Sequence, residues 1–181
     1  MTDKLRGKKI AMLVADGFEQ EELTRPKQAL EEAGAQVEII SPSEGGQVKG
    51  WDHTQWGDKF PIDVHLENAK AEDYDALVLP GGVMNPDHLR RYDEAVEFAK
   101  HFFEAGKPIA AICHGPWLLA EADVLKGRKL TSYFSISTDL KNAGAEWVDE
   151  EVVVDRNLIT SRKPADIPAF NREIIDKVGG A

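Results

Sequence analysis

The chain has 181 residues, of which 42% are hydrophobic and 30% charged, and its formal net charge is −10. This length favours a single domain over 1–181 that buries its own core. The negative charge argues against a stable complex with nucleic acid or an anionic membrane. No segment has the apolar length of a membrane span, and the polar stretch 1–9 lacks a signal-peptide core, so we expect a soluble cytoplasmic protein.

Apolar runs alternate with amphipathic stretches along the chain. The runs at 9–15, 36–40, 76–79 and 109–112 predict strands buried on both faces. The stretches at 21–33, 93–105, 114–122 and 166–178 predict helices, with a kink or second start at Pro26 and an N-cap at Asp166. A short strand at 130–132 and a hairpin formed by 147–155 and 158–161 complete the pattern. Strands alternating with helices predict an α/β fold with a mostly parallel sheet.

The segment 41–68 departs from this rhythm, because it is rich in glycine and proline and contains Trp51 and Trp56. We interpret it as a hairpin-like excursion from the domain and not as a second domain. The two tryptophans are expected to pack in the core beneath it, with a subunit contact as the alternative.

Cys113, the only cysteine, excludes an internal disulfide and a cysteine-rich zinc site. A lone cysteine is usually a small buried hydrophobe. Here, however, it directly follows an apolar strand and precedes a glycine and a predicted helix, as in a nucleophile elbow. The start of that helix should favour the thiolate and lower the pKa of Cys113. We therefore predict that Cys113 is a catalytic nucleophile.

Two other strand ends should meet Cys113 at the same edge of the sheet. His114 is either a base that polarises the thiolate or a residue that packs at the helix start. Glu19 is either an acid/base near the sulfur or a solvated loop acid. The backbone amides of His114 and Gly82 could form an oxyanion hole. The other histidines are scattered, and we predict neither a metal site nor a cofactor.

Several stretches in order along the chain resemble the PfpI family, which is named for an archaeal intracellular protease. They are GFEQEEL at 17–23, DALVLPGG at 75–82, GKPIAAICHGP at 106–116, LKGRKLTSY at 125–133, NAGAEWVDEEVVVD at 142–155 and SRKPADIPAF at 161–170. The resemblance implies a flavodoxin-like three-layer sandwich within the class I glutamine amidotransferase-like superfamily.

The resemblance also implies roles for individual residues. Cys113 matches the family nucleophile, His114 the histidine paired with it, and Glu19 the glutamate that hydrogen-bonds the nucleophile. In the family an acid from a neighbouring subunit completes the site, and the matching position here is Asp87, one methylene shorter than glutamate. A shared site implies a homodimer or a homohexamer. Tyr133, in the matched TSY element, is expected near the pocket.

Relatives of this kind suggest three functions. The first is a stress-protective glyoxalase or deglycase that acts on methylglyoxal, glyoxal or their adducts on proteins or nucleotides. The alternatives are an intracellular cysteine peptidase and an oxidant sensor that uses Cys113 sulfenic acid. A glutamine amidotransferase is disfavoured because no histidine follows His114 in the chain. Carbonyl chemistry is the preferred prediction, largely because the resemblance to the family implies it; it also needs only one small pocket with a thiolate and one acid/base.

Overall fold

A seven-stranded sheet forms the centre of the molecule, for which a computed structural model describes residues 3–180. The strand order is β11-β12-β8-β7-β1-β3-β6, and every neighbouring pair is parallel except β11 with β12. The strands are β1 (Lys9–Leu13), β3 (Gln36–Ser41), β6 (Val64–His65), β7 (Ala76–Leu79), β8 (Ile109–Ile112), β11 (Val153–Asp155) and β12 (Leu158–Ser161). The predicted mostly parallel sheet is confirmed.

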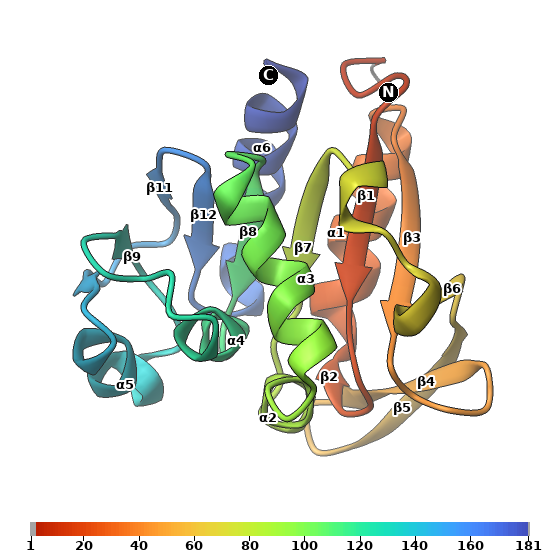
Figure 1. Ribbon diagram of the computed structural model, residues 1–181, viewed down its shortest axis with the longest axis horizontal. Helices are drawn as coiled ribbons and strands as arrows, with labels where there is room; N and C mark the ends of the chain where they lie inside the picture. The colour runs from red at the N-terminus through yellow and green to blue at the C-terminus, as the bar shows by residue number, and fades with distance from the viewer. Residues whose placement is uncertain (1–2, 181) are drawn as a thin grey trace.

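Helices cover both faces of this sheet (Figure 1). On one face lie α1 (Gln20–Glu32) and α6 (Ile167–Gly179), and on the other α2 (Met84–Leu89), α3 (Asp93–Glu104), α4 (Pro116–Glu121) and α5 (Ser137–Asn142). Short 3₁₀ helices are η1 (Leu66–Asn68), η2 (Ala71–Asp73), η3 (Phe134–Ile136) and η4 (Pro164–Asp166). This is the flavodoxin-like three-layer arrangement that the resemblance to the PfpI family implies.

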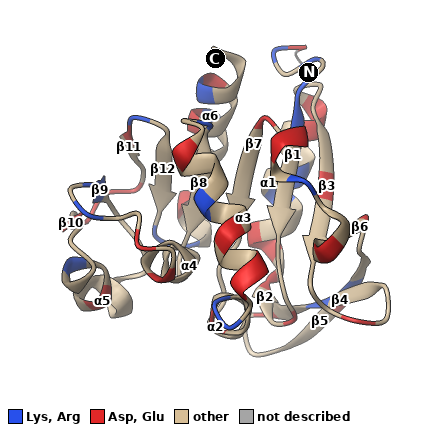
Figure 2. Cartoon of the chain, in the orientation of Figure 1, with Lys and Arg blue, Asp and Glu red and all other residues tan. Residues whose placement is uncertain are grey.

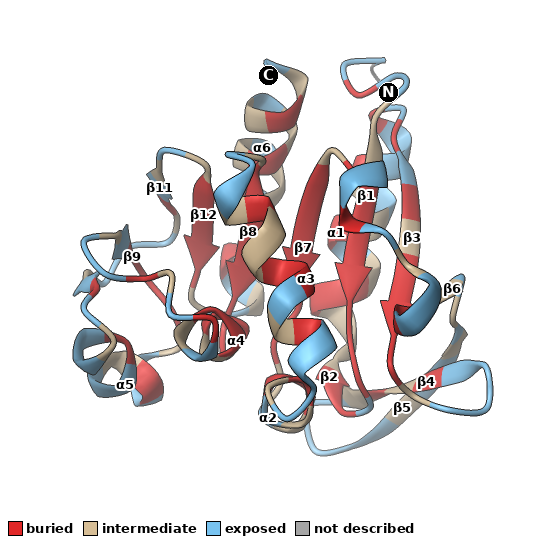
Figure 3. Ribbon diagram, viewed as in Figure 1, coloured by how far each residue is buried: buried red, intermediate tan, exposed pale blue. Residues whose placement is uncertain are grey.

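Two hydrophobic cores, one on each face, follow from the alternation of side chains along the strands. In β1, Ile10 and Met12 pack in the core beneath α1 and α6, whereas Ala11 and Leu13 pack in the core beneath α3 and α4. The central strands are buried along their length (Figure 3) and β7, β8 and β12 carry no charged residue (Figure 2). Polar groups therefore gather where the strands end.

Two smaller sheets flank the main one. Strand β2 (Phe18–Glu19) pairs with β4 (Gln47–Asp52), which forms an antiparallel hairpin with β5 (Gln55–Pro61). This hairpin lies in the segment 41–68 and meets β2 at the carboxyl end of β1 (Figure 1). Strand β9 (Lys129–Leu130) pairs in parallel with β10 (Glu146–Trp147).

Three local predictions need correction. Helix α1 continues through Pro26 without a second start; the ring lies on the buried face, and the helix gives up the one hydrogen bond that an amide at this position would donate to Glu22 O. Trp147 belongs to β10, so the hairpin with β12 is formed by Val153–Asp155 alone. Asp166 precedes α6 but does not cap it, since its carboxylate accepts hydrogen bonds from Arg162 instead. Among residues 3–180, no helix is both long and apolar enough to cross a membrane.

Candidate active site

Cys113 occupies a strained turn between β8 and α4. Its φ of 63° lies in the left-handed region, which a residue with a side chain rarely adopts. Backbone hydrogen bonds hold the turn: the amide of Cys113 donates to Ser161 O at 3.0 Å, and its carbonyl accepts from the amide of Tyr133 at 2.9 Å. Gly115 lets the chain pass the neighbouring strand, because a Cβ there would lie 2.6 Å from Leu79 O. The local geometry is that of a nucleophile elbow.

The Cys113 side chain opens on a cavity of about 640 Å³ at the carboxyl end of the sheet. Only 8% of the residue is exposed, so the sulfur lies at the inner end of a cavity and not on the surface. The cavity is lined by Gly17, Glu19, Glu22, Trp51, His53, Gly82, Val83, Met84, Cys113, His114, Tyr133, Ser135 and Pro164. It is large enough for a small substrate and for part of a larger one.

Glu22, and not Glu19, is the carboxyl that lies against Cys113. Glu22 is fully buried on the first turn of α1, and its Oε1 accepts a hydrogen bond of 2.9 Å from the amide of Gly81. Its Oε2 has no hydrogen-bond partner of good geometry among residues 3–180, although the nearby thiol of Cys113 acts on the carboxyl as a donor. The predicted contact between Glu19 and the sulfur is therefore corrected to Glu22, one helical turn further along.

The electrostatics of this pair also correct the sequence prediction. Burial is the main cause that raises the pKa of Glu22 to about 8, so the carboxyl is largely protonated at neutral pH. Burial, together with the charge of Glu22 when it is ionised, raises the pKa of the Cys113 thiol. The predicted lowering by a helix start is wrong, because α4 begins only at Pro116 and the thiol is buried. Cys113 and Glu22 thus compete for a proton.

Two backbone amides oppose the rise in the pKa of the Cys113 thiol. The amides of Gly82 and His114 donate toward Cys113 and lower its pKa. They are the two groups that the sequence suggests for an oxyanion hole, and the fold brings both to the sulfur. Gly82 has a φ of 79°, and a Cβ there would lie 2.5 Å from Gly17 O, so only glycine fits this close approach.

His114 lies directly beside the sulfur. Its Nδ1 is 3.2 Å from Cys113 Sγ and its Nε2 is 3.4 Å from the hydroxyl of Ser135. The ring stacks on Tyr133 at 5.1 Å between centroids and meets Trp117 edge-on. Burial lowers the pKa of His114, which favours the neutral imidazole. This ring can accept or donate a proton at the sulfur but is not held as a permanent cation.

The remaining predicted residues, Glu19 and Asp87, lie further from Cys113 than Glu22 and His114 do. Glu19 lines the outer part of the cavity, where its Oε1 accepts a hydrogen bond of 3.1 Å from the amide of His53. Burial is the main cause that raises the pKa of Glu19. Asp87 is exposed on α2, and within the described chain no hydrogen bond or ion pair joins it to His114.

Sequence reasoning missed Glu22, Trp51 and His53 as residues of the cavity. Trp51 was expected in the core, yet it lines the cavity, and Trp56 is 46% exposed. A signal for Glu22 exists, because it precedes the buried Pro26 by four residues and so lies on the apolar face of α1. The hairpin residues carry no such local signal, since their place depends on how β4 pairs with β2.

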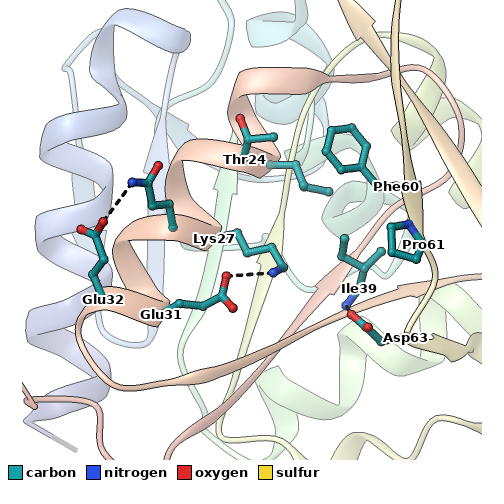
Figure 4. A pocket seen from close by; sticks show the side chains of 10 residues that line it. Thr24, Lys27, Glu31, Glu32, Ile39, Phe60, Pro61 and Asp63 are labelled. Carbon is teal, nitrogen blue, oxygen red and sulfur yellow. Dashed lines mark hydrogen bonds and ion pairs between the residues drawn. The ribbon is translucent and has the colours of Figure 1, made fainter.

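A second cavity, of about 580 Å³, lies between α1, β3 and β5, away from Cys113 (Figure 4). Its charged side chains are engaged with partners: Lys27 Nζ is 2.8 Å from Glu31 Oε1, and Asp63 accepts from the amide of Ile39. In the described part of the chain, no group of three or more His, Cys, Asp or Glu residues is placed to hold a metal ion. The cavity at Cys113 is the one that combines a nucleophile with groups that can move protons.

Comparison with known proteins agrees with this geometry. Residues 8–177 match the family model described as DJ-1/PfpI family. The chain is 50% identical over 169 residues to a Bacillus subtilis protein named "Putative cysteine protease YraA", covering 93% of this chain and 97% of that protein.

Solved structures show the same fold. A two-domain protein from Anabaena variabilis, with DJ-1/ThiJ/PfpI-like and ferritin-like domains, superposes with a TM-score of 0.90 at 39% identity. The match covers 95% of this chain but only 48% of that longer one. Drosophila melanogaster DJ-1beta matches with a TM-score of 0.86 at 31% identity, covering 100% of this chain and 92% of that chain. The chain belongs to the DJ-1/PfpI family.

Proposed function

We propose that this protein is a cysteine-dependent enzyme that converts reactive carbonyl compounds, such as methylglyoxal and glyoxal or their adducts, into hydroxy acids. The observation that carries the proposal is the buried pair of Cys113 and Glu22, in which a carboxyl with a pKa of about 8 lies against the only thiol of the chain. Such a carboxyl can both give and take a proton near neutral pH. The negative net charge and the family are consistent with a cytoplasmic protein that forms no stable complex with nucleic acid.

The reaction begins when Cys113 Sγ attacks the aldehyde carbon of methylglyoxal. The reacting form is the one in which Cys113 and Glu22 hold a single proton between them. A carbon–sulfur bond forms, and this proton passes to the aldehyde oxygen, which gives a hemithioacetal and leaves Glu22 as a carboxylate. The amides of Gly82 and His114, which donate toward Cys113, can donate to this oxygen as charge develops on it.

The Glu22 carboxylate then takes the proton from the carbon bonded to sulfur, and the ketone oxygen gains a proton, which gives an enediol. Glu22 returns its proton to the adjacent carbon while the former aldehyde oxygen loses its own proton and becomes the thioester carbonyl. This converts the hemithioacetal into the thioester of lactic acid without any change in overall composition. Water cleaves the thioester, releasing lactate and restoring the thiol. His114, neutral and 3.2 Å from the sulfur, is placed to activate that water.

Peptide hydrolysis is the second candidate, because a relative that is 50% identical is named as a cysteine protease. The contact of 3.2 Å between Cys113 and His114 is the pair that such a reaction uses. We place it second because the elements around Cys113 form a cavity of about 640 Å³ whose inner end holds the sulfur, whereas a peptide bond within an extended chain needs a groove.

The resemblance to PfpI proteins also supports a homodimer or homohexamer in which Asp87 of one subunit approaches His114 of another. His114 Nε2 contacts only the hydroxyl of Ser135 at 3.4 Å within its own described chain, so a carboxylate from outside has a place to bind. Loss of activity in Asp87→Asn, restored in mixed oligomers with Cys113→Ser subunits, would support a shared site.

The deciding experiment compares wild type with Cys113→Ser on two substrates, methylglyoxal and a fluorogenic peptide. Lactate formation by wild type and its loss by a factor of about 100 or more in the variant would support the proposal. Peptide cleavage without lactate formation would favour the second candidate. Lactate formation that survives Cys113→Ser would remove the proposed mechanism.

A further inference from the structure

We propose that the mouth of the Cys113 cavity is a charge filter that admits neutral substrates and disfavours anionic ones, with Glu21 and Asp52 as specificity-determining residues. The inference deepens the proposed function, since it names the substrate class of the same cavity. It is argued from the contacts of the β4–β5 hairpin tip, from the charges around it and from the interior of the cavity.

The tip of the hairpin is fixed against the start of α1 by His53. This residue has a φ of 55°, in the left-handed region, and its amide donates to Glu19 Oε1 at 3.1 Å. Its Nε2 lies 3.1 Å from Glu21 Oε2 and 3.8 Å from Asp52 Oδ1, and its Nδ1 lies 3.5 Å from Glu19 Oε1. Three carboxylates therefore surround one imidazole that lines the cavity.

Positive charge at this mouth is small. Arg25 Nη1 lies 3.6 Å from Glu21 Oε1 and 3.5 Å from the carbonyl of Pro164, so it offsets part of one carboxylate. Among the described residues that line the cavity there is neither lysine nor arginine. Even with His53 protonated, three carboxylates oppose two cations. A carboxylate on a substrate finds no fixed cation inside.

The interior of the cavity also disfavours an anion. Glu22 is fully buried and lines the cavity, and its Oε2 has no hydrogen-bond partner of good geometry among residues 3–180. Its side chain repels an anion whenever Glu22 is ionised. An anionic substrate is therefore disfavoured both on entry and next to the sulfur.

The first test uses alkylation of Cys113, which needs no catalytic turnover. Iodoacetamide and iodoacetate react alike, since the sulfur forms a bond to carbon and iodide leaves, but only iodoacetate carries a negative charge. Because Cys113 is the only cysteine, total labelling reports its rate directly. Each rate is divided by the rate of the same reagent with the urea-unfolded chain, which removes the intrinsic difference between the reagents.

At low ionic strength the normalised rates of wild type should favour iodoacetamide, and Glu21→Gln should reduce that preference about three-fold. The double variant Glu21→Gln/Asp52→Asn should reduce the preference for iodoacetamide about ten-fold. In 0.5 M salt, the preferences of wild type and the variants should lie closer together. Glu31→Gln is the matched control, because it removes the same charge and an i,i+4 pair from the same helix, away from the mouth. It should leave the preference unchanged.

Turnover supplies the second test, with methylglyoxal and mesoxalic semialdehyde, an α-oxoaldehyde of similar size in which a carboxylate replaces the methyl group. The ratio of kcat/KM for methylglyoxal over the anionic compound should fall in Glu21→Gln and not in Glu31→Gln. If neither compound is converted, the proposed function is wrong. The alkylation rates still show whether the mouth of the cavity selects against negative charge. The filter is overturned if the native preference for iodoacetamide equals that of the unfolded chain, if Glu21→Gln and Glu31→Gln behave alike, or if native Cys113 reacts with neither reagent.

Discussion

Glu22 and Cys113 meet in the space where Gly81 lacks a side chain. A Cβ on that glycine would lie 2.5 Å from Glu22 Oε1 and 2.7 Å from Cys113 Cβ, so both side chains approach the same point of the loop after β7. The Gly81 amide donates to Glu22 at 2.9 Å, and the next amide, that of Gly82, donates toward the sulfur. One loop thereby fixes the position of both groups.

The first prediction separates the two glutamates. Glu22→Gln keeps the size and the contact with Gly81 but cannot take a proton, so turnover of methylglyoxal should fall about 100-fold or more. Glu19→Gln alters only the outer cavity and should reduce kcat about three-fold or less. The measurement is kcat for lactate formation by both variants at pH 7. A larger loss in Glu19→Gln than in Glu22→Gln would contradict the assignment of Glu22.

The second prediction concerns the pH dependence of stability. The pKa of Glu22 is about 8 in the folded chain against an ordinary value of 4.5, so the folded state binds more protons than the unfolded state between these values. The free energy of unfolding of wild type should therefore decrease as pH rises through this window. At pH 9 the loss from Glu22 should be on the order of 2–5 kcal/mol.

Glu22→Gln should remove this loss, because its amide stays neutral at every pH. Urea unfolding at pH 5, 7 and 9 checks the expectation, with Glu19→Gln as a control that lies further out. Wild type and Glu22→Gln should differ little at pH 5, and the variant should be the more stable at pH 9. Parallel curves for the two proteins across this range would show that Glu22 titrates normally.

The parallel sheet and the elbow could be predicted because their signals are local: uninterrupted apolar runs, and a cysteine between such a run and a glycine. Glu22 is separated from Glu19 and Glu21 only by helical periodicity, since it alone of the three acids lies four residues before the buried Pro26 and eight before the buried Leu30. The pKa of Cys113 was misjudged because burial, a tertiary property, outweighs the nearby amides. His53 reaches the cavity through strand pairing between distant segments, which no local pattern encodes.

The third prediction is that Gly81→Ala lowers activity strongly while the secondary structure stays native. Gly81 has no positive φ, so alanine suits its backbone, but the new methyl group would lie within 2.7 Å of Glu22, Cys113 and the carbonyl oxygen of Ile112 and would displace the site around them. Activity should fall about 100-fold, while far-UV circular dichroism stays native. Gly50→Ala is the control, because it also lacks a positive φ and its Cβ would meet only side-chain atoms of Gln20 and Phe18 at 3.1 Å or more. Equal losses in both variants would argue against a role for the space at Gly81.

The last prediction concerns Asn85, which supports the same loop from below. This side chain is fully buried, accepts a hydrogen bond of 2.7 Å from the amide of Ala15, and donates to the carbonyls of Pro80 and Gly81 at 2.9 and 3.1 Å. Asn85→Ala removes the side-chain partner of the buried Ala15 amide and Pro80 carbonyl, whereas the Gly81 carbonyl still accepts from the amide of Glu19 at 3.4 Å. The variant should therefore destabilise the chain by about 2–4 kcal/mol. It should also release the Gly82 amide from the sulfur, so alkylation of Cys113 by iodoacetamide should change in the protein that remains folded.

Asn157→Ala serves as the matched control at the opposite end of the sheet. Asn157 also bridges elements, since it accepts from Arg128 at 2.9 Å and donates to Lys107 O at 2.8 Å, but it precedes β12 at the end away from Cys113. Urea unfolding should show that both variants lose stability, whereas only Asn85→Ala should alter the alkylation rate under conditions where each variant is fully folded. If the two variants left that rate equally unchanged, the loop would hold Cys113 and Glu22 without help from Asn85, and the assigned support would be wrong.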